Sequence, residues 1–189
     1  ARPALLDSYE TERRPIGEQV IAGASALHEI ILAHGTGVEE RMKRVQDPTW
    51  LGLAAGKISG IAYTYRDCVA NPSALKLLDG PAIGDRAPDV DLSQGRTLFS
   101  LLCHPSLTLL VMARGDVPAA ERIGGEFRGR HGSVVRVEML AHDPALAARY
   151  RLGEEGRLYL IRPDGYIGFR CLFSEAGHLM SHLEGWITS

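Results

Sequence analysis

Leu107-Thr108-Leu109-Leu110-Val111-Met112 is a short apolar run without a charged residue. A run of this length is typical of a buried strand, and it is far too short to cross a membrane. After this run, the pattern of residues Pro118 to Arg128 predicts a helix, and the β-branched stretch from Ser133 to Leu140 predicts a second strand. The middle of the chain therefore predicts a strand, a helix and a strand.

The remaining C-terminal elements follow the same logic. Residues Asp143 to Tyr150 begin with an aspartate cap and a proline, which is typical of a helix start. Two strands, Arg157 to Arg162 and Tyr166 to Arg170, flank Pro163-Asp164-Gly165, a hairpin turn whose glycine can adopt positive φ. Glu175 to Ile187 closes the chain as a helix. The order predicts the thioredoxin arrangement: an α/β fold whose mixed sheet ends in an antiparallel hairpin, with helices on both faces.

The N-terminal part reads as helical. From Ala4 to Ala33 apolar residues recur at helical spacing, and Pro15 is expected to split this stretch into two helices. A further helical stretch, Val38 to Lys57, is interrupted where Asp47 can cap a new helix, and Ile61 to Tyr65 is expected to form a short strand. The apolar stripe of the first stretch consists of Leu5, Leu6, Tyr9, Ile16, Val20, Leu27, Ile30 and Ile31.

Helix breakers divide the chain. Asn71-Pro72-Ser73 and Asp79-Gly80-Pro81 fall between residues 67 and 83, which we therefore expect to be a linker. Residues 1–66 would then form a helical tail, and residues 84–189 would form the thioredoxin-like domain.

Composition excludes several classes of function. The chain has 189 residues, of which 45% are hydrophobic and 23% are charged, as in ordinary globular proteins. Its 21 Lys and Arg residues against 23 Asp and Glu give a net charge of -2, so no nucleic-acid partner is expected. No run is long enough to span a membrane. Three widely spaced cysteines, Cys68, Cys103 and Cys171, do not suit a secreted disulfide framework, so we expect a soluble protein of the cytoplasm.

Dithiol chemistry is disfavoured. The redox enzymes of the thioredoxin fold need Cys-x-x-Cys at the start of the helix after the first core strand, and residues 113–118 contain no cysteine. Glu155-Gly156-Arg157 stands where those enzymes carry a cis-proline. Cys103 lies beside His104, but adjacent side chains rarely point the same way, so we expect Cys103 to be a buried structural cysteine.

Candidate metal ligands and nucleophiles are sparse. His178 and His182 have the spacing of a zinc pair on a helix, yet the glutamate of His-Glu-x-x-His and a third ligand are absent, which favours a solvated or capping role. The other histidines lack metal spacing, namely His28, His34, His104, His131 and His142. The serines considered as nucleophiles lack a nucleophile elbow, namely Ser100, Ser106 and Ser133.

No dinucleotide site is apparent. Gly84-Asp85-Arg86 and Gly124-Gly125 are the nearest approaches to a phosphate loop, and neither resembles Gly-x-Gly-x-x-Gly between a strand and a helix. One cluster of alternating charges is expected to be either a solvated helix face with i,i+4 pairs or a docking contact, and consists of Asp7, Glu10, Glu12, Arg13 and Arg14.

Three stretches carry a family resemblance. Leu5-Leu6-Asp7-Ser8-Tyr9-Glu10-Thr11-Glu12-Arg13-Arg14-Pro15-Ile16-Gly17 resembles the segment that follows the flavin-binding core in FAD-dependent aromatic hydroxylases. These are the class A flavoprotein monooxygenases related to phenol hydroxylase and to the hydroxylases of aromatic polyketides. Ile83-Gly84-Asp85-Arg86-Ala87-Pro88-Asp89-Val90 and the hairpin from Leu158 to Arg170 resemble the opening and the terminal hairpin of their C-terminal thioredoxin-like domain.

The resemblance implies the C-terminal part of a monooxygenase that hydroxylates a phenolic or polyketide ring with NAD(P)H, O2 and FAD. The FAD fingerprint and the other flavin contacts of the family have no counterpart here, so it assigns this chain no catalytic, cofactor-binding or metal residue. The chain starts at Ala1 within apparent helix interior, so we expect a piece whose partner is the N-terminal FAD and substrate portion, with self-association when isolated. The alternative is a stand-alone thioredoxin-like interaction module without redox activity.

Overall fold

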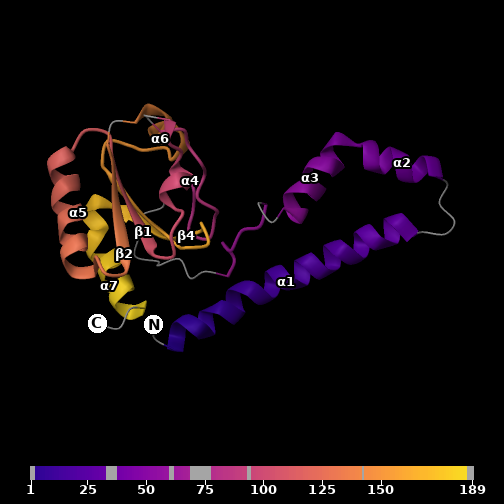
Figure 1. Ribbon diagram of the computed structural model, residues 1–189, viewed down its shortest axis with the longest axis horizontal. Helices are drawn as coiled ribbons and strands as arrows, with labels where there is room; N and C mark the ends of the chain where they lie inside the picture. The colour runs from indigo at the N-terminus through magenta and orange to yellow at the C-terminus, as the bar shows by residue number, and fades with distance from the viewer. Residues whose placement is uncertain are drawn as a thin grey trace. The chain divides into compact units, whose positions relative to one another are not determined.

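The chain divides into two compact units. A computed structural model describes residues 3–32, 38–59, 62–68, 78–92, 95–141 and 143–186 (Figure 1). The N-terminal unit is Pro3–Thr64, and the C-terminal unit begins at Tyr65. Each unit is described by itself.

The C-terminal unit contains a four-stranded mixed sheet. Its strands are β1 (Leu107–Ala113), β2 (Val135–Ala141), β3 (Arg157–Ile161) and β4 (Ile167–Leu172). The order across the sheet is β2-β1-β3-β4, with β1 parallel to β2 and β3 antiparallel to both β1 and β4. The thioredoxin arrangement that the sequence predicts is therefore confirmed.

Helices cover both faces of this sheet (Figure 1). They are α4 (Leu98–Leu101), α5 (Val117–His131), α6 (Pro144–Arg149) and α7 (Ala176–Trp186). The carboxylate of Asp116 accepts a hydrogen bond from the Ala119 amide at the start of α5, and that of Asp143 accepts one from the Leu146 amide at the start of α6. The short helix α4 was not expected from the sequence, because one turn leaves no periodicity to detect.

Strand β1 is buried on both faces because it contributes to two cores. Leu109 and Val111 belong to a cluster that includes side chains of α5 and α7. Leu110 and Met112, pointing the other way, belong to a cluster with side chains of α4 and α6. This alternation explains why the run reads as uniformly apolar in the sequence.

The N-terminal unit is helical. It contains α1 (Pro3–Leu32), α2 (Val38–Gln46) and α3 (Pro48–Ile58). The predicted split at Pro15 is wrong, because α1 continues through it. A proline removes one backbone hydrogen bond, and the helix tolerates this where the carbonyl left without a partner, that of exposed Thr11, can meet water.

The end of the N-terminal unit differs in part from expectation. The Asp47 cap is confirmed, since its carboxylate accepts a hydrogen bond from the Thr49 amide at 2.8 Å. Residues 62–65 do not form the predicted strand; Ile61 lies outside the described residues. The Tyr65 amide donates to the Gly84 carbonyl at 2.8 Å, but the Tyr65 carbonyl accepts from the Cys68 amide in a turn, so no strand ladder forms.

The two units differ in exposed apolar surface. Among the described residues, every large hydrophobic side chain that is exposed belongs to the N-terminal unit, and these are Tyr9, Val20, Ile21, Val38, Met42 and Leu51. In the part of the chain that the structure describes, no helix is long and apolar enough to cross a membrane.

Candidate functional site

The fold places two of the resemblance stretches side by side. The Gly84 amide donates to the Ile167 carbonyl, and the Ile167 amide donates to the Asp85 carbonyl, both at 2.8 Å. The Ala87 amide donates to the Gly165 carbonyl at 2.9 Å. The opening segment thus pairs with the hairpin turn and the first residue of β4.

Gly84 is required by a close backbone approach. Its φ is +86°, a conformation that L side chains rarely adopt. A Cβ atom at this position would lie 2.6 Å from both the carbonyl carbon of Tyr65 and the amide nitrogen of Arg66. Residues 65 and 66 therefore cross directly over Gly84.

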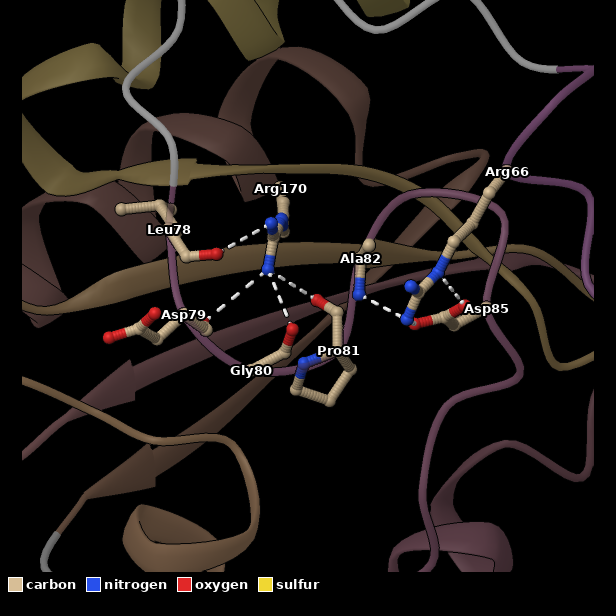
Figure 2. A network of polar contacts seen from close by, with 8 residues as sticks. All are labelled: Arg66, Leu78, Asp79, Gly80, Pro81, Ala82, Asp85 and Arg170. Carbon is tan, nitrogen blue, oxygen red and sulfur yellow. Dashed lines mark hydrogen bonds and ion pairs between the residues drawn. The ribbon is translucent and has the colours of Figure 1, made fainter.

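Arg66 is held by a paired carboxylate. Its Nε and Nη2 donate to the two carboxylate oxygens of Asp85, and the Ala82 amide also donates to Asp85 at 2.8 Å (Figure 2). The hydrogen bonds that Arg66 donates to the Asp85 carboxylate raise the pKa of its guanidinium. The Arg66 side chain is 57% exposed and that of Asp85 is 17% exposed, so this contact fixes geometry more than it stabilises the fold.

Arg170 of β4 binds the segment that leads into the unit. Its guanidinium nitrogens donate to the carbonyl oxygen of Leu78 at 2.7 Å and to that of Pro81 at 2.6 Å (Figure 2). The same group also reaches the carbonyls of Asp79 at 3.4 Å and Gly80 at 3.1 Å. Arg170 therefore donates to four consecutive carbonyl oxygens, and those of Leu78, Gly80 and Pro81 depend on it.

Arg157 of β3 binds the same segment from a second position. Its Nη1 donates to the Asp79 carbonyl and, at 3.2 Å, to the Tyr150 carbonyl. Arg157 is only 7% exposed, which is exceptional for an arginine and requires such partners. We call residues 65–66 and 78–87, with Arg157 and Arg170, the anchor.

Aromatic contacts complete the anchor. Tyr65 and Tyr166 pack edge to face with ring centroids 4.6 Å apart. The Arg162 guanidinium lies 5.7 Å from the Tyr65 ring centroid and forms an ion pair with Asp164 at 2.7 Å. The Asp85 carboxylate is thus engaged with Arg66 and the Ala82 amide, and that of Asp164 with Arg162, so we interpret the anchor as a structural element.

The cysteines do not form a redox pair. Cys103 is exposed and its Sγ donates to the Phe99 carbonyl at 3.3 Å, so the expectation that it is buried is wrong. It follows the one-turn helix α4, where the chain turns back to the surface. Cys171 is buried in β4, and this burial raises the pKa of its thiol. Cys68 is half-buried.

His178 and His182 do not act as a pair. His178 is exposed, whereas His182 packs between Phe169 and Trp186, with centroid distances of 4.6 and 4.5 Å. Burial lowers the pKa of His182. The predicted solvated or capping role is therefore wrong for His182, because β4 and the end of α7 enclose its ring. Among the described residues, no group of three or more potential ligands could hold a metal ion.

The other polar candidates have separate positions. His104 accepts a hydrogen bond from the Ser106 amide at 3.2 Å and contacts Thr108, and His131 contacts the sulfur of Met180. The side chain of His28 is exposed and so is that of Ser133, whereas the Ser100 amide belongs to the cap of α4. His34 and His142 lie outside the described residues.

The charged cluster of α1 is mostly a solvated face. Glu10 and Arg14 form an exposed i,i+4 ion pair at 3.3 Å, and the Arg13 guanidinium lies 5.6 Å from the Tyr9 ring centroid. Glu12 differs, since its side chain is buried. Asp7 is exposed.

The glycines of the described residues do not fit a flavin. Gly124 and Gly125 lie inside α5, and a Cβ on Gly124 would meet the Met139 sulfur at 2.7 Å, so Gly124 serves helix-to-sheet packing. Gly84 is covered by the chain at residues 65 and 66. Neither position offers free amides for a pyrophosphate, so no step of a flavin reaction is assigned to these residues.

The arginines of the anchor were missed in the sequence. A signal was present: Arg157 and Arg170 are charged residues within otherwise apolar strands, and such residues need buried partners. Nothing in the sequence identifies those partners, because backbone carbonyls have no sequence signature. Arg66 carries no signal at all.

The comparisons with known proteins agree with this fold. A model of the family described as aromatic-ring hydroxylase, C-terminal, matches residues 80–189. Over 99% of its length the chain is 34% identical to pentachlorophenol 4-monooxygenase of Sphingobium chlorophenolicum, of which it covers 38%. It is also 31% identical, over 88% of its length, to a 12-dehydrotetracycline 5-monooxygenase/anhydrotetracycline 6-monooxygenase of Streptomyces rimosus, of which it covers 31%. The chain thus spans about a third of the curated relatives it matches.

Solved structures give the same result. An anhydrotetracycline hydroxylase of Streptomyces rimosus matches 98% of this chain with a TM-score of 0.62 and 26% identity, and the match covers 36% of that protein. Aklavinone-11 hydroxylase, solved with FAD and aklavinone, matches 97% with a TM-score of 0.55 and 25% identity, over 35% of its own length. These homologues are flavin-dependent aromatic monooxygenases. Because the family match covers more than half of the chain, the protein belongs to the aromatic-ring hydroxylases, and residues 80–189 are their C-terminal domain.

Proposed function

We propose that this chain is the C-terminal portion of a monooxygenase of the cytoplasm that hydroxylates a phenolic or polyketide aromatic ring with NAD(P)H and O2. The proposal divides the chain into a helical tail (1–66), a linker (67–83) and the thioredoxin-like domain (84–189). FAD, held by the N-terminal portion, would activate the oxygen. The present chain would serve structure and assembly.

The observation that carries this proposal is the match to pentachlorophenol 4-monooxygenase. It extends over 99% of the chain but only 38% of that relative, so most of the relative's length has no counterpart here. In this proposal the fold that holds the cofactor and the aromatic substrate belongs to the part of the relatives that this chain does not cover.

The exposed apolar side chains support an assembly role for the tail. Ile21 is 69% exposed and Tyr9 is 63% exposed on α1, and Val38 is 67% exposed on α2. Exposing large apolar groups costs about 25 cal/mol per Å² relative to burial. We infer that these side chains bury against the N-terminal portion of the same protein.

The anchor suits a domain joined to such a tail. Arg157 and Arg170 hold residues 78–81 of the proposed linker on the sheet, and Asp85 holds Arg66. The chain therefore leaves the domain from a fixed position. A fixed exit limits the geometries that an attached catalytic portion can adopt.

The test of the proposed activity uses the full-length gene product. We expect it to bind FAD, to oxidise NADH or NADPH faster when a phenol or a polycyclic aromatic polyketide is added, and to incorporate one atom of labelled O2 into the product. The 189-residue chain alone is the control and should bind no FAD. A full-length product without flavin, or one whose gene begins at Ala1, would instead indicate the stand-alone interaction module.

A matched pair of variants tests the role of the tail. In the full-length protein, Ile21→Glu should reduce the bound flavin or the yield of folded protein, because it would bury an unpaired carboxylate. Gln19→Glu adds the same charge at an exposed polar position two residues away and should change neither. Equal behaviour of the two variants would contradict burial of Ile21.

A further inference from the structure

A hollow of about 500 Å³ opens near the carboxyl ends of β1 and β2. In α/β sheets with parallel strands this edge is where ligands commonly bind, and a hollow of this volume matches those of small-molecule sites. Two arginines and one acid line it together with a small apolar wall, and the lining consists of Arg114, Asp143, Pro144, Ala147, Ala148, Arg151 and Leu152.

The charges of the hollow are not balanced. In the described part of the chain, neither Arg114 nor Arg151 forms a hydrogen bond or an ion pair through its guanidinium. One oxygen of the Asp143 carboxylate already accepts the Leu146 amide at 2.9 Å. Asp143 is the one acidic residue of the lining, so the two guanidiniums give the hollow an excess of positive charge.

The two arginines come from separate elements that meet at this edge. Arg114 directly follows β1, where the alternation of side chains places it on the side of Leu110 and Met112, the side covered by α6. Arg151 follows α6, and its φ of +50° is the only positive value for a non-glycine residue among the described positions. The Leu152 amide bonds the Ala147 carbonyl and the Arg151 amide bonds that of Ala148, so this conformation ends α6 at a position where glycine is the usual residue.

The strained backbone at Arg151 is supported by the anchor. The Leu152 amide donates to the Ala147 carbonyl at 2.9 Å, and the Tyr150 carbonyl accepts from Arg157. A Cβ on Gly80 would come within 3.6 Å of the Cβ of Arg151, so the anchor segment passes directly behind it. These contacts fix the backbone position from which the exposed Arg151 side chain extends.

We propose that this hollow binds an organic anion, whose carboxylate or phosphate lies between Arg114 and Arg151 and whose apolar body packs on Pro144, Ala147 and Leu152. Guanidinium groups recognise both anions through charge-assisted hydrogen bonds. This site goes beyond the proposed monooxygenase activity and does not depend on it, because all of its described residues belong to the thioredoxin-like domain.

The test is an NMR titration of the full 189-residue chain with four probes: benzoate, phenyl phosphate, inorganic phosphate and benzamide. We expect saturable shifts at residues 114 and 143–152 with benzoate or phenyl phosphate, and the tighter of the two identifies the preferred anion. Benzamide has the shape of benzoate without its charge and should bind about tenfold more weakly or worse. Inorganic phosphate should also be weaker than phenyl phosphate; equal affinity would overturn the role assigned to the apolar wall.

Matched variants assign the site. Arg114→Gln and Arg151→Gly should each weaken binding about tenfold or more, and the glycine keeps the positive φ so that only the side chain is lost. Arg149→Gln removes an exposed arginine of α6 that does not line the hollow and should change affinity less than about twofold. No saturable shifts, or equal weakening in all three variants, would overturn the proposal and leave the proposed monooxygenase activity untouched.

Discussion

The two units of this protein differ in how completely they bury their large apolar side chains. The C-terminal unit has a central strand, β3, in which every residue is buried, and none of its described large hydrophobic side chains is exposed. The N-terminal unit has all the exposed ones, on three helices. A unit that buries its apolar residues is stabilised by its own contacts, whereas one that exposes them depends on a partner.

The largest expected change in the free energy of unfolding comes from comparing one core residue with one exposed residue. Phe127 is 1% exposed in α5, and Phe127→Ala should lower the free energy of unfolding by about 3–5 kcal/mol. Ile21 is 69% exposed, and Ile21→Ala should change it by about 0.5 kcal/mol or less. Chemical denaturation of the 189-residue chain measures both. Similar losses would mean that α1 already has a core.

Two glycines test whether the C-terminal unit includes residues 65 and 66, which pack over Gly84. Gly84→Ala should cost about 3 kcal/mol, since φ is +86° and the new Cβ would collide with the backbone of residues 65 and 66. Gly165→Ala has a similar φ of +82° but open space around it, so it should cost only about 1 kcal/mol. Equal costs would show that residues 65 and 66 do not pack over Gly84.

Removal of an arginine tests the anchor itself. Arg170→Ala leaves the carbonyls of Leu78, Gly80 and Pro81 without this donor and should lower the free energy of unfolding by about 2 kcal/mol, with faster amide exchange at residues 78–83. Arg136→Ala is the control: its side chain is 53% exposed and its ion pair with Glu138 should be worth about 0.5 kcal/mol. Unchanged exchange in Arg170→Ala would contradict the anchor.

The smallest expected effect is a pH dependence of the C-terminal unit. Burial lowers the pKa of folded His182 below its unfolded value of about 6.5. The unfolded state therefore binds more protons as the pH falls through about 6.5, and the free energy of unfolding should fall with it. His182→Phe should remove this part of the dependence, whereas His178→Phe, at an exposed position, should retain it. Denaturation at about pH 7.5 and 5.5 measures how much free energy of unfolding each variant loses at the lower pH.

Helices and strands could be predicted from the sequence better than the contacts that hold distant segments together. The strands, α5, α6, α7 and the hairpin could be identified because each depends on a local pattern, such as the apolar run from Leu107 or the turn glycine at 165. The anchor could not, because it depends on arginine side chains that meet carbonyls about 80 to 90 residues away. Pro15 and His182 were misread for a related reason: the setting of a residue, exposed for one and enclosed for the other, decides its role.

The crossing of residues 65 and 66 over Gly84 has a mechanical consequence. A pull applied to the chain at Thr64 would first load the hydrogen bond from Tyr65 to Gly84 and the ion pair between Arg66 and Asp85. Only after these had parted would tension reach residues 78–81 and the arginines of β3 and β4. The contacts of residues 65 and 66 would thus break first under load, while the arginines of β3 and β4 still hold residues 78–81 on the sheet.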